Sequence, residues 1–153
     1  MRQLHICDGV QIHYDDSSTD SGEAIEIIYP TSLTGVVTLA MYDGNAGGNY
    51  GNFTITLSAG QPIGSTGFSL ASVSTPVNGI QNGGTSGAPA PDGLALVCGG
   101  AVIQFLSYEG VFTAVGGPAA GLVSTNIGVA EAGETLIHFV DAPTECIHSV
   151  QLL

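Results

Sequence analysis

The chain has no lysine and a single arginine, Arg2, against thirteen aspartates and glutamates, so its formal charge at pH 7 is −12. Proteins that bind nucleic acid draw most of their affinity from Lys and Arg side chains set against phosphates. We therefore expect no direct binding of nucleic acid. The same shortage excludes mechanisms that need a Schiff-base lysine, an arginine finger or a cationic phosphate clamp.

Long apolar runs are also missing. No run approaches the roughly 20 residues that a membrane-spanning helix needs, so the sequence predicts no membrane span. The opening residues, MRQLHICDGV, lack the apolar core of a secretory signal peptide. The chain is then either not exported or an exported protein without its signal.

Cysteines are few, and their number is odd: Cys7, Cys98 and Cys146. They are too far apart for a zinc knuckle. In an extracellular protein one pair could be oxidised, and the spacing does not say which. Cys98 ends an apolar run, where we expect it to be a small buried side chain.

What the chain does contain is glycine, at 23 of 153 residues, with Thr, Val, Ile and Ser filling the runs between the glycines. Scarce helix formers, β-branched runs and frequent turns are typical of an all-β protein. The length suits one domain with its own core. We therefore expect a single domain over residues 1–153, with residues 1–9 its least ordered part.

The most informative stretch is PAPDGLALVCGGAVIQFLSYEGVF, from Pro89 to Phe112. Its two apolar runs, 94–98 and 101–106, are separated only by Gly99-Gly100. Glycines tolerate the positive φ that two-residue hairpin turns need, so this pattern predicts a β-hairpin. We expect that hairpin to form the centre of a sheet.

Shorter strand patterns precede and follow the hairpin. Val37, Leu39 and Met41 share one parity within residues 36–42, while Asp43–Asn52 is a glycine- and asparagine-rich turn region. Residues 53–58 alternate apolar and hydroxyl side chains, as a half-buried strand does. Further strands are predicted at 10–14, 24–29, 66–72, 135–140 and 147–153.

Residues 109–131 show no sustained period of 2 or 3.6, so we interpret them as an ordered surface loop with room for one short helical turn. Eight or nine short strands with regular turns predict an all-β, two-sheet β-sandwich.

Several segments in this order resemble one family: IHYDDSSTDSGEAIEI, LAMYDGNAGGNY, GIQNGG, PDGLALV, VIQFLSYEGVFTAVGGPAAGLVSTNIGVAE and HSVQLL. They span nearly the whole chain from Ile12 onward and resemble the bacterial type of lamin tail domain, an immunoglobulin-like β-sandwich. The chain departs from that family at CDGVQ, where a strand ending in Asn-Glu is usual. It also has a longer stretch before the last strand, ETLIHFVDAPTECIHS.

The resemblance implies an accessory domain rather than a catalyst. Bacterial domains of this type accompany secreted or surface nucleases, phosphatases and other exported proteins. The function expected is a non-catalytic binding module of an exported or cell-surface protein that contacts a protein or glycan partner. The location expected is extracellular or at the cell surface.

The resemblance also implies a structural role for one set of residues, in which Tyr108 fills the sandwich and Glu109 accepts backbone hydrogen bonds from the following loop. The alternative is that Glu109 acts as a general base beside Tyr108. The motif consists of Asp92, Gly93, Ser107, Tyr108, Glu109 and Gly110.

An acidic loop gives the alternative function, which is calcium binding. Asp15, Asp16, Asp20 and Glu23 lie among hydroxyl residues, and Ca²⁺ takes six to eight oxygen ligands. Asp43 or Glu109 could complete the shell. The spacing does not match an EF-hand, and a solvated turn between strands explains the same residues.

Two further interpretations remain. A small hydrolase would need a nucleophile such as Ser86, but the sequence has no G-x-S-x-G elbow, and the four histidines, His5, His13, His138 and His148, lack the spacing of a metal-ligand set. A homo-oligomer would form if exposed edge strands of two copies paired.

Overall fold

The structure is a computed structural model that describes residues 24–74 and 91–128 in full, and the backbone of residues 4–5, 9–15, 136–140 and 149–150. The strands are β1 (Leu4–His5), β2 (Gly9–Asp15), β3 (Ala24–Pro30), β4 (Val36–Asp43), β5 (Gly48–Thr56), β6 (Gln61–Pro62), β7 (Phe68–Ser74), β8 (Asp92–Cys98), β9 (Ala101–Tyr108), β10 (Thr125–Asn126), β11 (Leu136–Val140) and β12 (Ser149–Val150). One 3₁₀ turn, η1 (Leu57–Ala59), follows β5.

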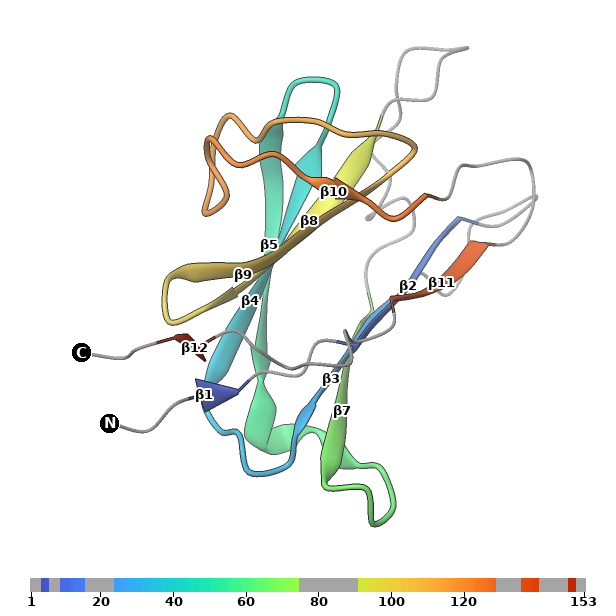
Figure 1. Ribbon diagram of the computed structural model, residues 1–153, viewed down its shortest axis with the longest axis vertical. Coiled ribbons are helices and arrows are strands. Elements are labelled where there is room, and N and C mark those ends of the chain that lie inside the picture. Colours follow the sequence, from blue (N-terminus) through green and yellow to red (C-terminus); the bar gives the residue numbers. More distant parts are fainter. Residues whose placement is uncertain are drawn as a thin grey trace.

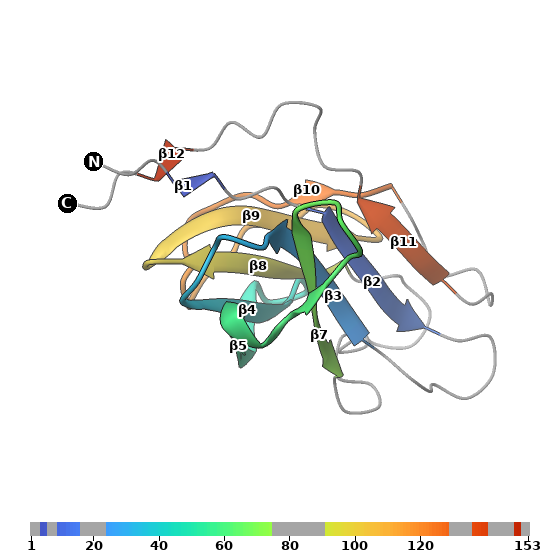
Figure 2. The ribbon, with the colours of Figure 1, turned by 90° about the horizontal axis from the view of Figure 1, so that it is seen from below.

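The strands form two five-stranded sheets, in the orders β10-β9-β8-β4-β5 and β11-β2-β3-β7-β6, and a small pair, β1-β12 (Figure 1). The view from below shows the two large sheets as separate layers (Figure 2). The predicted all-β, two-sheet β-sandwich is therefore confirmed, with eight strands of five residues or more. Among the described residues, no helix is long and apolar enough to cross a membrane.

The predicted hairpin is present as β8 and β9. Gly99 and Gly100 have φ values of +57° and +83°, so both turn positions use the left-handed region that favours glycine. β8 lies between β9 and β4, at the middle of its sheet. The prediction that this hairpin forms the centre of a sheet is confirmed.

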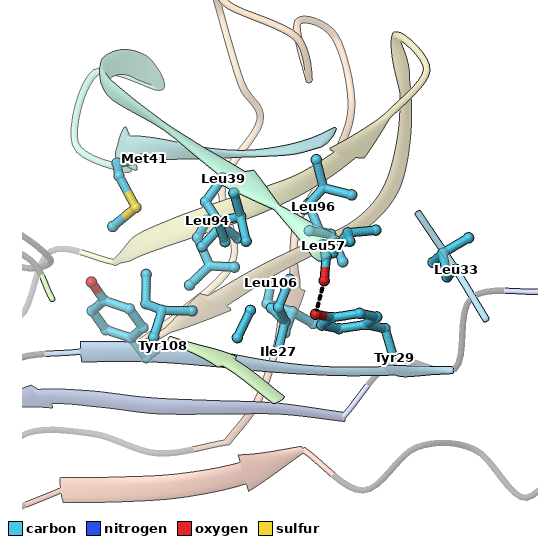
Figure 3. Close-up of a cluster of buried hydrophobic side chains, with 14 residues drawn as sticks. Ile27, Tyr29, Leu33, Leu39, Met41, Leu57, Leu94, Leu96, Leu106 and Tyr108 are labelled. Atoms are coloured by element: carbon cyan, nitrogen blue, oxygen red, sulfur yellow. Dashed lines mark hydrogen bonds between the residues drawn. The ribbon is translucent and has the colours of Figure 1, made fainter. Parts of the chain in front are cut away.

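The space between the two sheets is filled by one apolar cluster (Figure 3). Val37, Leu39 and Met41 all belong to it, as their shared parity predicts. On the opposite sheet the Tyr29 hydroxyl, which is buried, donates a hydrogen bond to the carbonyl of Leu57. This bond holds the end of β5 and the 3₁₀ turn against β3.

The predicted turn region over residues 43–52 is shorter in the structure, because β5 begins at Gly48. A register shift between Met41 and Tyr42 accommodates this glycine-rich start. The Asn49 side chain donates hydrogen bonds to the carbonyls of Met41, at 2.9 Å, and Gly51, at 3.1 Å. Asparagine and glycine therefore extend this strand instead of ending it.

Both faces of the sheet that contains β8 are covered. Leu94 and Leu96 point into the space between the sheets, whereas Ala95 and Val97 join a second cluster on the outer face. The segment that covers this outer face is residues 109–128, here called the loop layer, drawn in orange between β9 and β10 (Figure 1). Burial on both faces explains why β8 has a continuous apolar run and not an alternating one.

The loop layer is an ordered loop, as expected, but it contains a turn and not a helical segment. Its turn is closed by hydrogen bonds from Ala120 N to Gly117 O, at 3.2 Å, and from Leu122 N to Ala119 O, at 2.9 Å. It ends in β10, which pairs parallel to β9 at Leu106 and Ser107. The sequence analysis did not predict β1, β6 or β10, because two residues are too few to show alternation.

The loop layer is fixed to the sheet by a buried hydrogen bond, which Ala119 N donates to the Tyr42 hydroxyl at 2.8 Å. We predict that Tyr42→Phe lowers the free energy of unfolding by about 1–3 kcal/mol, since it leaves a buried N–H without an acceptor. Urea denaturation at equilibrium measures this. A loss below about 0.5 kcal/mol would show that the bond contributes little to stability.

Candidate functional site

The loop layer contains a short two-stranded ribbon made of residues 111–115 and 122–124. Thr113 and Val123 form an antiparallel bridge. Two backbone hydrogen bonds flank it, from Ala114 N to Leu122 O at 3.0 Å and from Ser124 N to Phe112 O at 2.9 Å. Neighbouring residues of the ribbon therefore point to opposite sides, as in any β-strand.

The inner side of the ribbon packs on the sheet. Phe112, Ala114 and Ser124 are buried, and the Ser124 hydroxyl oxygen accepts a hydrogen bond from Phe112 N at 3.1 Å. The Phe112 ring meets Phe105 edge-on, with 5.3 Å between the ring centroids. Phe105 lies 5.1 Å from Tyr42 by the same measure. Such aromatic pairs contribute about 0.5–1.5 kcal/mol beyond their buried area.

The outer side of the ribbon is exposed and aliphatic. Val111, Val115 and Val123 have exposed fractions of 56%, 76% and 63%. With Thr113 they form what we call the outer ribbon face, and Leu122, at 45%, adjoins it. No residue between Gly110 and Ala130 carries a charge. Exposed aliphatic side chains that gather on one face, without charge, are a candidate contact surface.

Two close approaches hold the ribbon in place. Val115 N donates a hydrogen bond to Gly47 O at 2.7 Å, which joins the layer to the β4–β5 turn. Gly117 has φ of +65°, and a Cβ there would lie 2.7 Å from the Tyr42 hydroxyl. A residue with a side chain would meet both strain and a clash at that position. The outer ribbon face is therefore presented on a fixed support.

This surface was not predicted from the sequence. Residues 109–131 were expected to form a surface loop because no single period is present. The available signal was that VFTAV, residues 111–115, has apolar side chains at both odd and even positions. A strand with one buried and one exposed face normally alternates apolar and polar residues.

The structure brings the six motif residues together where β8 begins and β9 ends. Asp92 pairs with Tyr108 and Gly93 with Ser107. Tyr108 is buried in the cluster between the sheets, the position that the resemblance implies. The Ser107 hydroxyl donates a hydrogen bond to Gly110 O at 2.7 Å.

Asp92 is buried, and one of its carboxylate oxygens accepts a hydrogen bond from Gly44 N at 3.1 Å. It lies opposite Asp43 in the register of β4 and β8. A carboxylate that accepts a backbone N–H at a strand end fixes the adjacent turn. Its position is that of a residue that fixes the β4–β5 turn against the start of β8.

Glu109 has φ of +61°, a left-handed conformation that is rare for residues other than glycine. We predict that Glu109→Ala costs about 1 kcal/mol more stability than Glu109→Gly, because alanine keeps this strain and glycine removes it. Thermal or urea unfolding of the two variants measures the difference. Equal stabilities would mean that the backbone at this position is unstrained in the folded protein.

The calcium ligands expected from sequence fall largely outside the described residues. Only the backbone of Asp15 is described, and Asp16, Asp20 and Glu23 are not. The half-buried Asp43 uses a carboxylate oxygen to accept a hydrogen bond from Asn45 N at 2.9 Å. Residues 24–74 and 91–128 hold no group of three or more His, Cys, Asp or Glu side chains suited to a metal. Calcium binding stays a prediction.

A calcium site in the acidic loop would raise the thermal midpoint in millimolar calcium by several degrees relative to excess chelator. At a hundredfold excess over Kd the folded state gains about 2.7 kcal/mol. The combined variant Asp16→Asn with Asp20→Asn should lose this gain. Asp43→Asn keeps an oxygen for Asn45 N and reports whether Asp43 is a ligand. If calcium produces no specific shift of the thermal midpoint in the unmodified chain, the acidic loop is a solvated turn and not a calcium site.

Cys98 is half-buried against the cluster between the sheets and is a free thiol. Burial raises the pKa of this thiol, so it stays protonated and weakly nucleophilic at neutral pH. The expectation that Cys98 is a small buried side chain is met only in part, since the residue packs against the cluster but remains partly exposed. Cys7, Cys146, Ser86 and the side chains of the four histidines lie outside the described residues.

The fold and the outer ribbon face define an all-β sandwich that carries an apolar loop layer. Comparison of the chain with protein-family models, with curated proteins and with solved structures found no match. The resemblance to the lamin tail domain therefore stays a prediction.

Proposed function

We propose that the chain is a non-catalytic accessory domain of the lamin tail type, which binds a partner through the outer ribbon face. The observation that carries this proposal is the exposure of Val111, Val115 and Val123 on a support that is itself tightly packed. A rigid surface loses little conformational entropy on binding, and aliphatic area removed from water supplies the driving force.

A protein partner fits this surface better than a glycan. Among the four residues of the outer ribbon face, Thr113 alone has a side-chain hydroxyl, so the face offers few groups that could bond to sugar hydroxyls. The face is a ribbon on the surface and not a concave site of the kind that encloses small ligands. We propose an extracellular or cell-surface setting, in keeping with the family that the sequence resembles.

A catalytic role has less support. Within the described residues, the polar side chains nearest the loop layer stabilise its ends, as Ser107 does at Gly110 and Ser124 does at Phe112. Hydroxyls that are committed to such bonds are not arranged as a nucleophile beside a base.

The test is a quantitative binding comparison with surface proteins of the cells that produce the chain. We predict that the combined variant Val115→Asp with Val123→Asp loses roughly tenfold or more affinity for a surface protein that binds the unmodified chain. Two carboxylates would have to be desolvated in an apolar contact. Val36→Asp is the matched control, because Val36 is an exposed valine at the start of β4 and outside the loop layer.

Both variants should unfold at nearly the same temperature as the unmodified chain, since all three valines are exposed. A partner that binds the double variant as tightly as the unmodified chain would contradict the proposal. If the chain hydrolyses a substrate, and a single substitution abolishes that activity while the protein stays folded, the catalytic alternative would replace the proposal.

A further inference from the structure

The acidic residues are distributed unevenly over the fold. Between Asp43 and Asp92 the chain has no Asp, Glu, Lys, Arg or His. That interval contains β5, η1, β6 and β7, which lie at neighbouring edges of the two sheets. These four elements therefore carry no charged side chain in a chain with a formal charge of −12.

β5 forms the edge of its sheet at this uncharged side. It is nine residues long, and among the described strands its only sheet neighbour is β4. Edge strands normally carry a charge or a proline that prevents another strand from pairing with them. The sequence of β5, GNYGNFTIT, has neither. The bulge and the Asn49 side chain, which also bonds to the side chain of Asn52, occupy its first half, and the backbone pairing is regular from Asn52 to Thr56.

A groove runs beside this regular half, between β5 and β7. Its volume is about 420 Å³. Uncharged side chains line it, among them Thr54, Ile55, Thr56, Ala71, Ser72 and Val73. The outer edge of β5 therefore borders open space, where a further strand can lie without displacing the described elements.

We propose that β5 pairs antiparallel with β5 of a second copy of this chain, about a two-fold axis at Thr54. Thr54 then faces Thr54, Phe53 faces Ile55, and Asn52 faces Thr56 across the junction. Each apolar side chain meets an apolar one and each polar side chain a polar one, as an isologous contact requires. The two β5-containing sheets become one continuous sheet.

Charge favours a second copy over a basic peptide. A basic partner would be held by carboxylates, and none lies in β5, η1, β6 or β7. Two copies of charge −12 repel each other, and β5 is an edge strand along which they can pair without placing carboxylates opposite one another. Salt screens that repulsion, with a Debye length of about 8 Å at 0.15 M, so pairing should strengthen as salt is raised.

The experiment is analytical ultracentrifugation of the full chain at micromolar to submillimolar concentration. We expect a monomer–dimer equilibrium that shifts toward dimer between 0.05 and 0.5 M salt (roughly 14 to 4 Å of screening). Thr54→Lys and Thr54→Asp should each be monomeric, because each places two like charges opposite one another at the axis. An equimolar mixture of the two variants should dimerise again, since opposite charges then meet.

Thr125→Lys is the control. Thr125 is exposed on β10, at the other edge of the same sheet, so the same substitution there should leave the dimer intact. A monomer under all conditions would overturn the proposal, as would a dimer that survives Thr54→Lys or that only Thr125→Lys disrupts. The proposal is independent of the outer ribbon face, so partner binding and dimerisation can fail separately.

Discussion

The structure depends on the burial of both faces of one sheet. β8 lies at its centre and sends Leu94 and Leu96 to one side and Ala95 and Val97 to the other. A sheet with two apolar faces is stable in water only if each is covered. The second large sheet covers one face, and the loop layer covers the other by placing Phe112, Ala114 and Ala119 on the aromatic cluster around Tyr42.

The way in which the two faces are covered determines which surfaces remain available for binding. The loop layer packs its inner face on the sheet, and the hydroxyls of Ser107, at the end of β9, and Ser124, on the ribbon, close its ends. Among the described residues, its outer ribbon face and the edge of β5 are uncharged surfaces that packing does not use. Both suit contacts between proteins better than they suit chemistry on a bound substrate.

Much of the fold could be predicted from the sequence because its signals are local. The Gly99-Gly100 turn specifies the hairpin, and the parity of Val37, Leu39 and Met41 specifies a buried face. The exposed aliphatic face could not be predicted, because Val111 and Val115 look like core residues until the fold shows that Phe112 and Ala114 occupy the inner side. Nor does a sequence show which strand lies at an edge, since the position of β5 depends on the pairing of β4 with β8.

The central claim is that residues 109–128 form a fixed layer on the sheet and not a mobile loop. Amide hydrogen exchange followed by NMR tests it most directly at Ala114, Gly121, Leu122 and Ser124, whose N–H groups are bonded within the layer. The account predicts that these amides exchange as slowly as those of β8, opening only when the domain unfolds. Exchange at the rate of an unstructured chain, with β8 still protected, would contradict it.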